Sequence, residues 1–79
     1  MTEIKFEIKT RGSMLVCYGD RTVTIYGELA FSPSAFYADK SSIKNWNIPY
    51  DTEEITETEK KEIMEYVQVN SIGTKIYFE

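Results

Sequence analysis

A dense run of carboxylates between residues 51 and 59 has the clearest chemical potential in this sequence. The run contains five acids within nine positions: Asp51, Glu53, Glu54, Glu57 and Glu59. Two closely spaced carboxylates can act as the acid and the base of a glycosidase, and several together can bind a hard cation such as calcium. The glycine and the alternating acids of a calcium-binding loop are absent from this run. A small enzyme or metal-dependent hydrolase using these groups is one hypothesis, and divalent cations would then raise its melting temperature.

The same acids also fit the beginning of a helix. Thr56 is followed three residues later by Glu59, a spacing at which each side chain accepts a hydrogen bond from the other residue's backbone N–H in a capping box. This signal predicts a helix over residues 57–70, and acids near its beginning stabilise the positive end of the helix dipole. Gly73 then permits the chain to reverse after the helix. We favour this structural role for the acids over catalysis or metal binding.

The other residue types that perform catalysis are scarce or poorly placed. The sequence has no histidine, which is the commonest general base and a frequent metal ligand. Its one cysteine, Cys17, falls within a predicted strand beside no activating base, so we expect a packed or half-exposed thiol. The four glycines are dispersed and do not form a phosphate-binding loop. We expect no catalytic residues, no metal and no cofactor.

The net charge of −4 is concentrated in one part of the chain. Residues 51–65 carry seven carboxylates and two lysines, whereas residues 1–44 carry six basic and five acidic side chains. Such an acidic patch repels nucleic acid and lipid headgroups but attracts a basic protein surface. We therefore predict a basic protein partner, bound through acids of the patch and a neighbouring aromatic ring. The candidate partner-binding residues are Tyr50, Asp51, Glu54, Glu62 and Glu65.

Alternating apolar residues predict three strands in the N-terminal half. These strands cover residues 2–9, 14–18 and 21–31. Gly19-Asp20 is a two-residue loop suited to a hairpin, which fixes the register of its two strands. The predicted cross-strand pairs are Tyr18–Arg21, Val16–Val23, Met14–Ile25, Ile8–Met14 and Phe6–Val16. Every second residue of the third strand, through Leu29 to Phe31, is then expected to face the core.

The remaining elements complete an α+β domain over residues 1–79. Further strands are predicted over residues 35–38, 43–48 and 75–79. The helix places Ile63, Met64, Tyr66 and Val67 on one broad apolar stripe. Trp46 is expected in the core, in a cluster with Ile48 and Tyr50 where the sheet meets the helix. We predict an antiparallel sheet of about five or six strands, with an N-terminal meander, one C-terminal helix packed on one face and a final short strand.

The sequence favours a cytoplasmic location. No apolar stretch approaches the roughly 20 residues of a membrane-spanning helix, and no signal-peptide pattern opens the sequence. Because a single cysteine cannot form an internal disulfide, the composition fits a reducing compartment. We expect no contact with a membrane, and the sequence does not indicate an oligomeric state.

One stretch of the chain resembles a known family. The run SSIKNWNIPYDTEEIT at residues 41–56 and the terminal KIYFE resemble small bacterial immunity proteins of polymorphic toxin systems. The most specific positions are Ser42-Ile43, Trp46, Pro49-Tyr50 and Ile55-Thr56, with Gly27-Glu28 upstream. Asn47 and Ile48 stand where that family often has an acid and a second proline. The resemblance implies a cytosolic protein that protects its producer by binding and blocking one toxin domain, and it supplies no catalytic residues.

The leading hypothesis is therefore an immunity protein that binds and neutralises a cognate toxin, such as a nuclease, through protein–protein contacts. A small homodimeric module with a structural or regulatory role is the alternative, because an edge strand leaves unpaired backbone groups that a second copy could bind. The carboxylate-based enzyme is the third hypothesis. The sequence identifies neither the toxin nor the interface.

Overall fold

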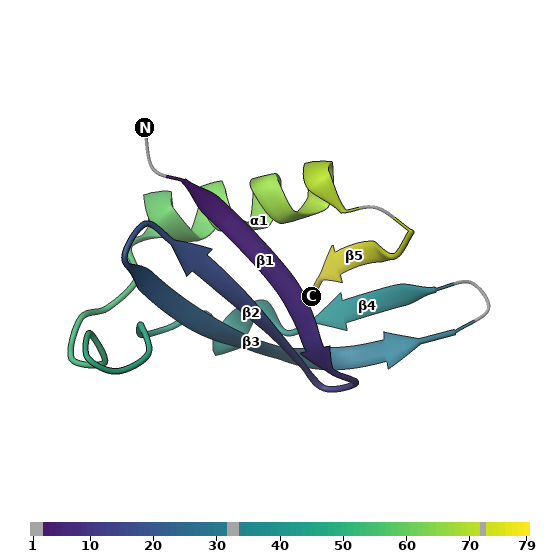
Figure 1. Ribbon diagram of the computed structural model, residues 1–79, viewed down its shortest axis with the longest axis horizontal. Coiled ribbons are helices and arrows are strands. Elements are labelled where there is room, and N and C mark those ends of the chain that lie inside the picture. Colours follow the sequence, from purple (N-terminus) through teal and green to yellow (C-terminus); the bar gives the residue numbers. More distant parts are fainter. Residues whose placement is uncertain (1–2, 32–33, 72) are drawn as a thin grey trace.

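The computed structural model describes residues 3–31, 34–71 and 73–79, which form a curled sheet and one helix (Figure 1). Each strand of the sheet lies beside the next one along the chain, in the order β1-β2-β3-β4-β5. The elements are β1 (Ile4–Thr10), β2 (Ser13–Tyr18), β3 (Arg21–Ala30), β4 (Ala35–Ala38), the short 3-10 helix η1 (Lys40–Ser42), α1 (Glu57–Asn70) and β5 (Lys75–Phe78). The predicted α+β class, with its N-terminal meander, C-terminal helix and final strand, is confirmed.

The meander β1-β2-β3 has the predicted register. All five predicted pairs occur: Tyr18–Arg21, Val16–Val23, Met14–Ile25, Ile8–Met14 and Phe6–Val16. Gly19 has a φ of 63°, the left-handed conformation that a two-residue hairpin loop requires. Met14, Val16, Val23 and Ile25 are at most 1% exposed, so the alternation seen in the sequence corresponds to a buried face. Thr2, the first residue of the predicted strand, lies outside the described residues.

The third strand ends one residue earlier than predicted. β3 stops at Ala30, which pairs with Ala35 of β4, and the chain turns at Phe31. Phe31 is 61% exposed, so the expectation that it faces the core is wrong. Its ring lies under the guanidinium of Arg11 instead, with the Arg11 Cζ 5.6 Å from the ring centroid. Leu29 keeps the predicted facing and packs against the core.

The last pair of strands, β4 and β5, runs parallel, whereas the other pairs are antiparallel. Parallel neighbours need a long crossover connection, and residues 39–74 provide one that contains α1. Phe36 and Ala38 of β4 face inward beside Ile76 and Phe78 of β5. Ile76 is buried and Phe78 is half-buried, as the alternation predicts.

The predicted strand over residues 43–48 is wrong. This segment is a loop that makes one isolated bridge, between Asn45 and Glu54. Ile43 and Trp46 are buried, with Trp46 only 2% exposed, so the predicted burial of Trp46 is confirmed. Ile48 would share a strand face with Trp46, but the chain turns at this point and leaves Ile48 82% exposed. Ile48 therefore does not join the predicted cluster with Trp46.

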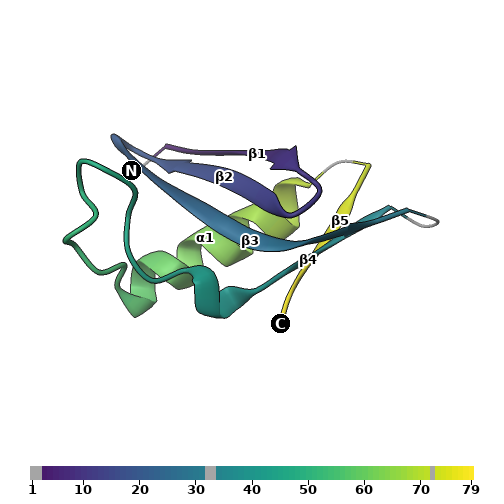
Figure 2. The same ribbon diagram turned by 90° about the horizontal axis from the view of Figure 1, so that it is seen from below.

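Helix α1 has the predicted bounds and the predicted capping box. The Thr56 hydroxyl accepts from the Glu59 backbone N–H, and the Glu59 carboxylate accepts from the Thr56 N–H. The helix lies on one side of the meander (Figure 2) and buries Ile63 and Val67 completely. The exposed Tyr66 completes the stripe through an edge-to-face contact with Phe6. After the helix, Gly73 adopts a φ of 80°, consistent with the predicted reversal.

Candidate functional site

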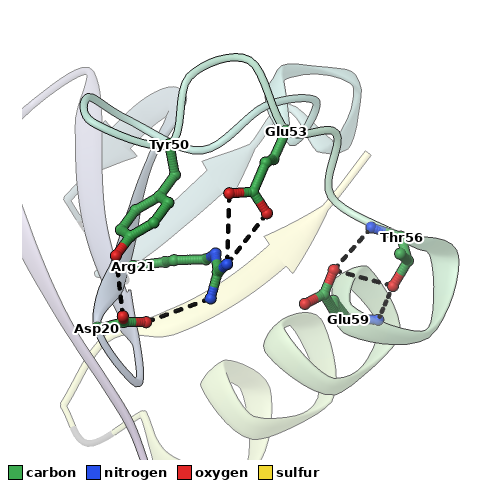
Figure 3. Close-up of polar contacts among 6 residues, drawn as sticks. All are labelled: Asp20, Arg21, Tyr50, Glu53, Thr56 and Glu59. Carbon is green, nitrogen blue, oxygen red and sulfur yellow. Dashed lines mark hydrogen bonds and ion pairs between the residues drawn. The ribbon is translucent and has the colours of Figure 1, made fainter.

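The loop between η1 and α1 is fastened to the β2–β3 hairpin by four side chains, which we call the Arg21 cluster: Asp20, Arg21, Tyr50 and Glu53 (Figure 3). The Arg21 guanidinium lies over the Tyr50 ring, with Cζ 4.4 Å from the centroid. One Arg21 nitrogen donates to both Glu53 carboxylate oxygens at 3.1 and 3.4 Å, and the other contacts Asp20 at 3.3 Å. The Tyr50 hydroxyl donates to the second Asp20 oxygen at 3.0 Å.

Backbone geometry brings these residues together. The glycine turn at Gly19 sets Asp20 and Arg21 at the tip of the hairpin, where their side chains extend toward the loop. In the loop, the Tyr50 N–H donates to the Asn47 carbonyl and the Glu53 N–H donates to the Tyr50 carbonyl. These two turns place the Tyr50 ring against the Arg21 guanidinium and bring the Glu53 carboxylate within hydrogen-bond distance of one of its nitrogens (Figure 3).

The Arg21 cluster has a net negative charge because two carboxylates surround one guanidinium. Asp20 and Glu53 both pair with Arg21, so little of its positive charge is available to an approaching molecule. The hydrogen bond to Asp20 raises the pKa of the Tyr50 phenol above its ordinary value, since the nearby carboxylate opposes formation of a phenolate. Tyr50 therefore stays neutral and remains a hydrogen-bond donor at physiological pH.

The raised pKa of Tyr50 predicts that this phenol ionises at a higher pH than an ordinary tyrosine. A tyrosine whose pKa is higher in the folded than in the unfolded chain contributes stability below the unfolded value of about 10, and loses that contribution as the pH rises further. We expect the Tyr50 phenol to ionise at a lower pH in Asp20→Asn than in the wild type. The difference in ultraviolet titration between each protein and its Tyr50→Phe derivative isolates this one ring. Identical titrations would show that Asp20 does not hold the phenol in solution.

The structure places the five predicted partner-binding residues in two groups. Tyr50, Asp51 and Glu54 lie together on the loop that precedes α1, whereas Glu62 and Glu65 lie further along the helix. Tyr50 is half-buried by the Arg21 cluster, and the four acids are exposed. Glu54 also lines a shallow groove between this loop and the beginning of α1, together with Ser41, Ile43, Lys44, Asn45, Ile55, Glu57 and Lys60.

Glu62 has a contact that the sequence did not predict. Its carboxylate accepts a hydrogen bond from the Tyr18 hydroxyl at 3.2 Å, which joins the middle of α1 to the end of β2. The Tyr18 ring lies 5.5 Å from the ring of the buried Trp46. Glu62 thus combines an exposed charge with a structural contact, while Glu54 and Glu65 offer exposed charge on the loop and on the helix.

Sequence reasoning missed the partners of Tyr50. The sequence places Arg21 beside the hairpin loop and Glu53 in the acidic run, but no local pattern joins residues about 30 positions apart. The hydrogen bonds of Asn47, in contrast, had a usable signal in the sequence. Asn47 stands where the resembled proteins often have an acid, and an amide can donate hydrogen bonds where a carboxylate cannot. The Asn47 side-chain amide donates to the hydroxyls of Thr22 and Thr24, at 3.2 and 3.1 Å, and its backbone N–H donates to the Thr22 carbonyl at 2.7 Å.

This surface can bind a partner through charged side chains, an aromatic ring and hydrogen bonds. Within residues 3–31, 34–71 and 73–79, no group of three or more His, Cys, Asp or Glu side chains is arranged to hold a metal ion. Cys17 is half-buried on β2. No helix in the described part of the chain is long and apolar enough to cross a membrane.

The sequence matches the model of one protein family, described as Immunity protein 74, over residues 5–79. No curated protein and no solved structure matches it. The match spans the meander, the Arg21 cluster, α1 and the final strand, and it confirms the resemblance to an immunity protein family that residues 41–56 indicated. The chain therefore belongs to the Immunity protein 74 family.

Proposed function

We propose that this protein binds a cognate bacterial toxin domain in the cytoplasm and neutralises it by occupying its surface. Family membership is the observation that carries the proposal, because an immunity protein protects the cell by recognising one toxin. The described residues also present a surface suited to recognition, in which acids surround a half-buried tyrosine on a loop fastened to the sheet.

The charge distribution supports a basic toxin, such as a nuclease, as the partner. Residues 51–65 carry seven acids and two lysines, and this segment runs from the loop into α1. A surface with one sign of charge attracts an oppositely charged protein over a distance and raises the association rate. We assign the binding surface to the predicted residues Tyr50, Asp51, Glu54, Glu62 and Glu65.

Neutralisation in a bacterial host tests this function directly. The toxin domain encoded beside the gene for this protein is expressed under tight control, with and without the immunity protein. We expect growth to stop with the toxin alone and to resume when both are present, and the two proteins to elute together in size-exclusion chromatography. A non-cognate toxin of similar charge is the control and should remain lethal. Continued growth arrest despite ample soluble immunity protein would contradict the proposal.

A further inference from the structure

The turn at Asn47–Tyr50 exposes an apolar tip in the loop that also carries Asp51, Glu53 and Glu54. Ile48 is 82% exposed, more than any other large apolar residue for which the structure gives an exposure, and Pro49 beside it is also exposed. A single exposed apolar side chain is common on a protein surface and needs no explanation by itself. The support given to this turn and the charge around it distinguish Ile48 from the others.

Both ends of the turn are fixed to the sheet. Before Ile48, the Asn47 backbone N–H and side-chain amide donate to Thr22 and Thr24 of β3. After Pro49, the Tyr50 ring lies against Arg21 (Figure 3), and the Tyr50 N–H closes the turn by donating to the Asn47 carbonyl at 2.9 Å. The residues on either side of the tip are thus fastened to the sheet, and the turn presents Ile48 to solvent.

The loop that carries the tip and the hairpin end that holds it are rich in acids. Asp20 and Glu53 belong to the Arg21 cluster, Asp51 and Glu54 follow in the same loop, and the one base among them, Arg21, is paired with two of these acids. In tight protein interfaces, a rigid apolar anchor enters a pocket on the partner while polar residues around it exclude water. Because the anchor is already ordered, less conformational entropy is lost when it binds.

We infer that Ile48, with Pro49, is the apolar anchor of the toxin interface and enters an apolar pocket that is rimmed by basic residues on the toxin. This inference rests on the proposed function and goes further, since it names the contact that sets the lifetime of the complex. The occupant follows from charge complementarity: the acids of this loop and of the Arg21 cluster fit a basic protein surface and repel a second copy of this acidic chain. The acids guide the approach, and the buried apolar contact slows dissociation.

Two substitutions at Ile48 separate apolar anchoring from charge. Ile48→Ala removes most of the apolar side chain, and we expect it to raise the dissociation constant at least about tenfold, mainly through faster dissociation. Ile48→Glu adds one more acid to the surface. It would tighten binding to a basic toxin if only charge mattered, and it should weaken binding more than Ile48→Ala if an apolar pocket receives this side chain.

The measurement is binding kinetics with the inactivated toxin domain encoded beside this protein's gene. Val69→Ala is the matched control, because Val69 is an aliphatic residue that is 75% exposed on α1, and its truncation should leave both rates unchanged. All variants should keep the wild-type melting temperature, since Ile48 makes little contact with the core. Wild-type dissociation rates for both Ile48 variants would overturn this inference while leaving the proposed function intact. Absence of any binding by the wild type would overturn the proposed function itself.

Discussion

Gly27→Ala is expected to destabilise this protein by about 3 kcal/mol or more, which is a large part of the stability of a 79-residue domain. A Cβ atom at Gly27 would collide with the Tyr37 carbonyl oxygen, and it would lie 2.7 Å from Cε1 of Phe36 and 2.9 Å from Cα of Ala38. Two of these three neighbours are backbone atoms of β4, so a change of side-chain rotamer does not relieve the collision. Strands β3 and β4 would have to separate.

Denaturant unfolding followed by circular dichroism measures this loss. Gly12→Ala is the matched control, because the nearest atom to an added Cβ there is the Gly27 carbonyl oxygen at 3.6 Å, an ordinary contact distance. We expect Gly12→Ala to change the free energy of unfolding by roughly 1 kcal/mol or less. If Gly27→Ala unfolded at the same denaturant concentration as Gly12→Ala, the close approach of β3 and β4 would not exist in solution.

Local signals in the sequence were sufficient for most of the fold. The Thr56–Glu59 spacing located the beginning of α1 because a capping box involves only four neighbouring residues. The Gly19-Asp20 loop fixed the register of β2 and β3 because the inward side chains repeat every second residue. In both cases, the interaction that determines the structure lies within a short stretch of chain.

The errors occur where distant contacts determine the structure. Residues 43–48 have the apolar content of a strand, but Ile43 and Trp46 are buried three positions apart and Asn47 is bound to β3. The parallel pairing of β5 with β4 likewise depends on the path of a crossover that contains a helix. Neither the loop at residues 43–48 nor the parallel pairing of β5 is indicated by a local sequence pattern.

The candidate site was predictable in composition but not in geometry. Clustered charge identified Asp51 and Glu54, and both are exposed. The cluster that holds Tyr50 joins the hairpin tip to a loop about 30 residues away, so its geometry required the structure. The exposed position of Ile48 required it as well, because an isoleucine two residues after a buried tryptophan would be buried in an extended strand.

The final prediction concerns the rate at which the partner associates. Glu54→Lys combined with Glu65→Lys reverses two exposed charges, one on the loop and one on α1, and leaves the Tyr18–Glu62 hydrogen bond in place. Exposed charges of this kind change stability by about 0.5 kcal/mol or less, so the fold should be retained. Long-range attraction should fall sharply, and we expect association with the inactivated toxin domain to slow on the order of tenfold at low salt.

The control changes the same number of charges at another place. Glu7→Lys combined with Glu28→Lys gives the same net charge, but these exposed acids lie on the strands β1 and β3, and Glu7 pairs with Leu15 on the outer face of the sheet. Raising the salt concentration should reduce the difference between the Glu54/Glu65 variant and the wild type, because dissolved ions screen steering. If the control slowed association and the Glu54/Glu65 variant did not, the binding surface would lie on the outer face of the sheet, around Leu15, Tyr26 and Arg11. Location rather than total charge is thus what this comparison measures.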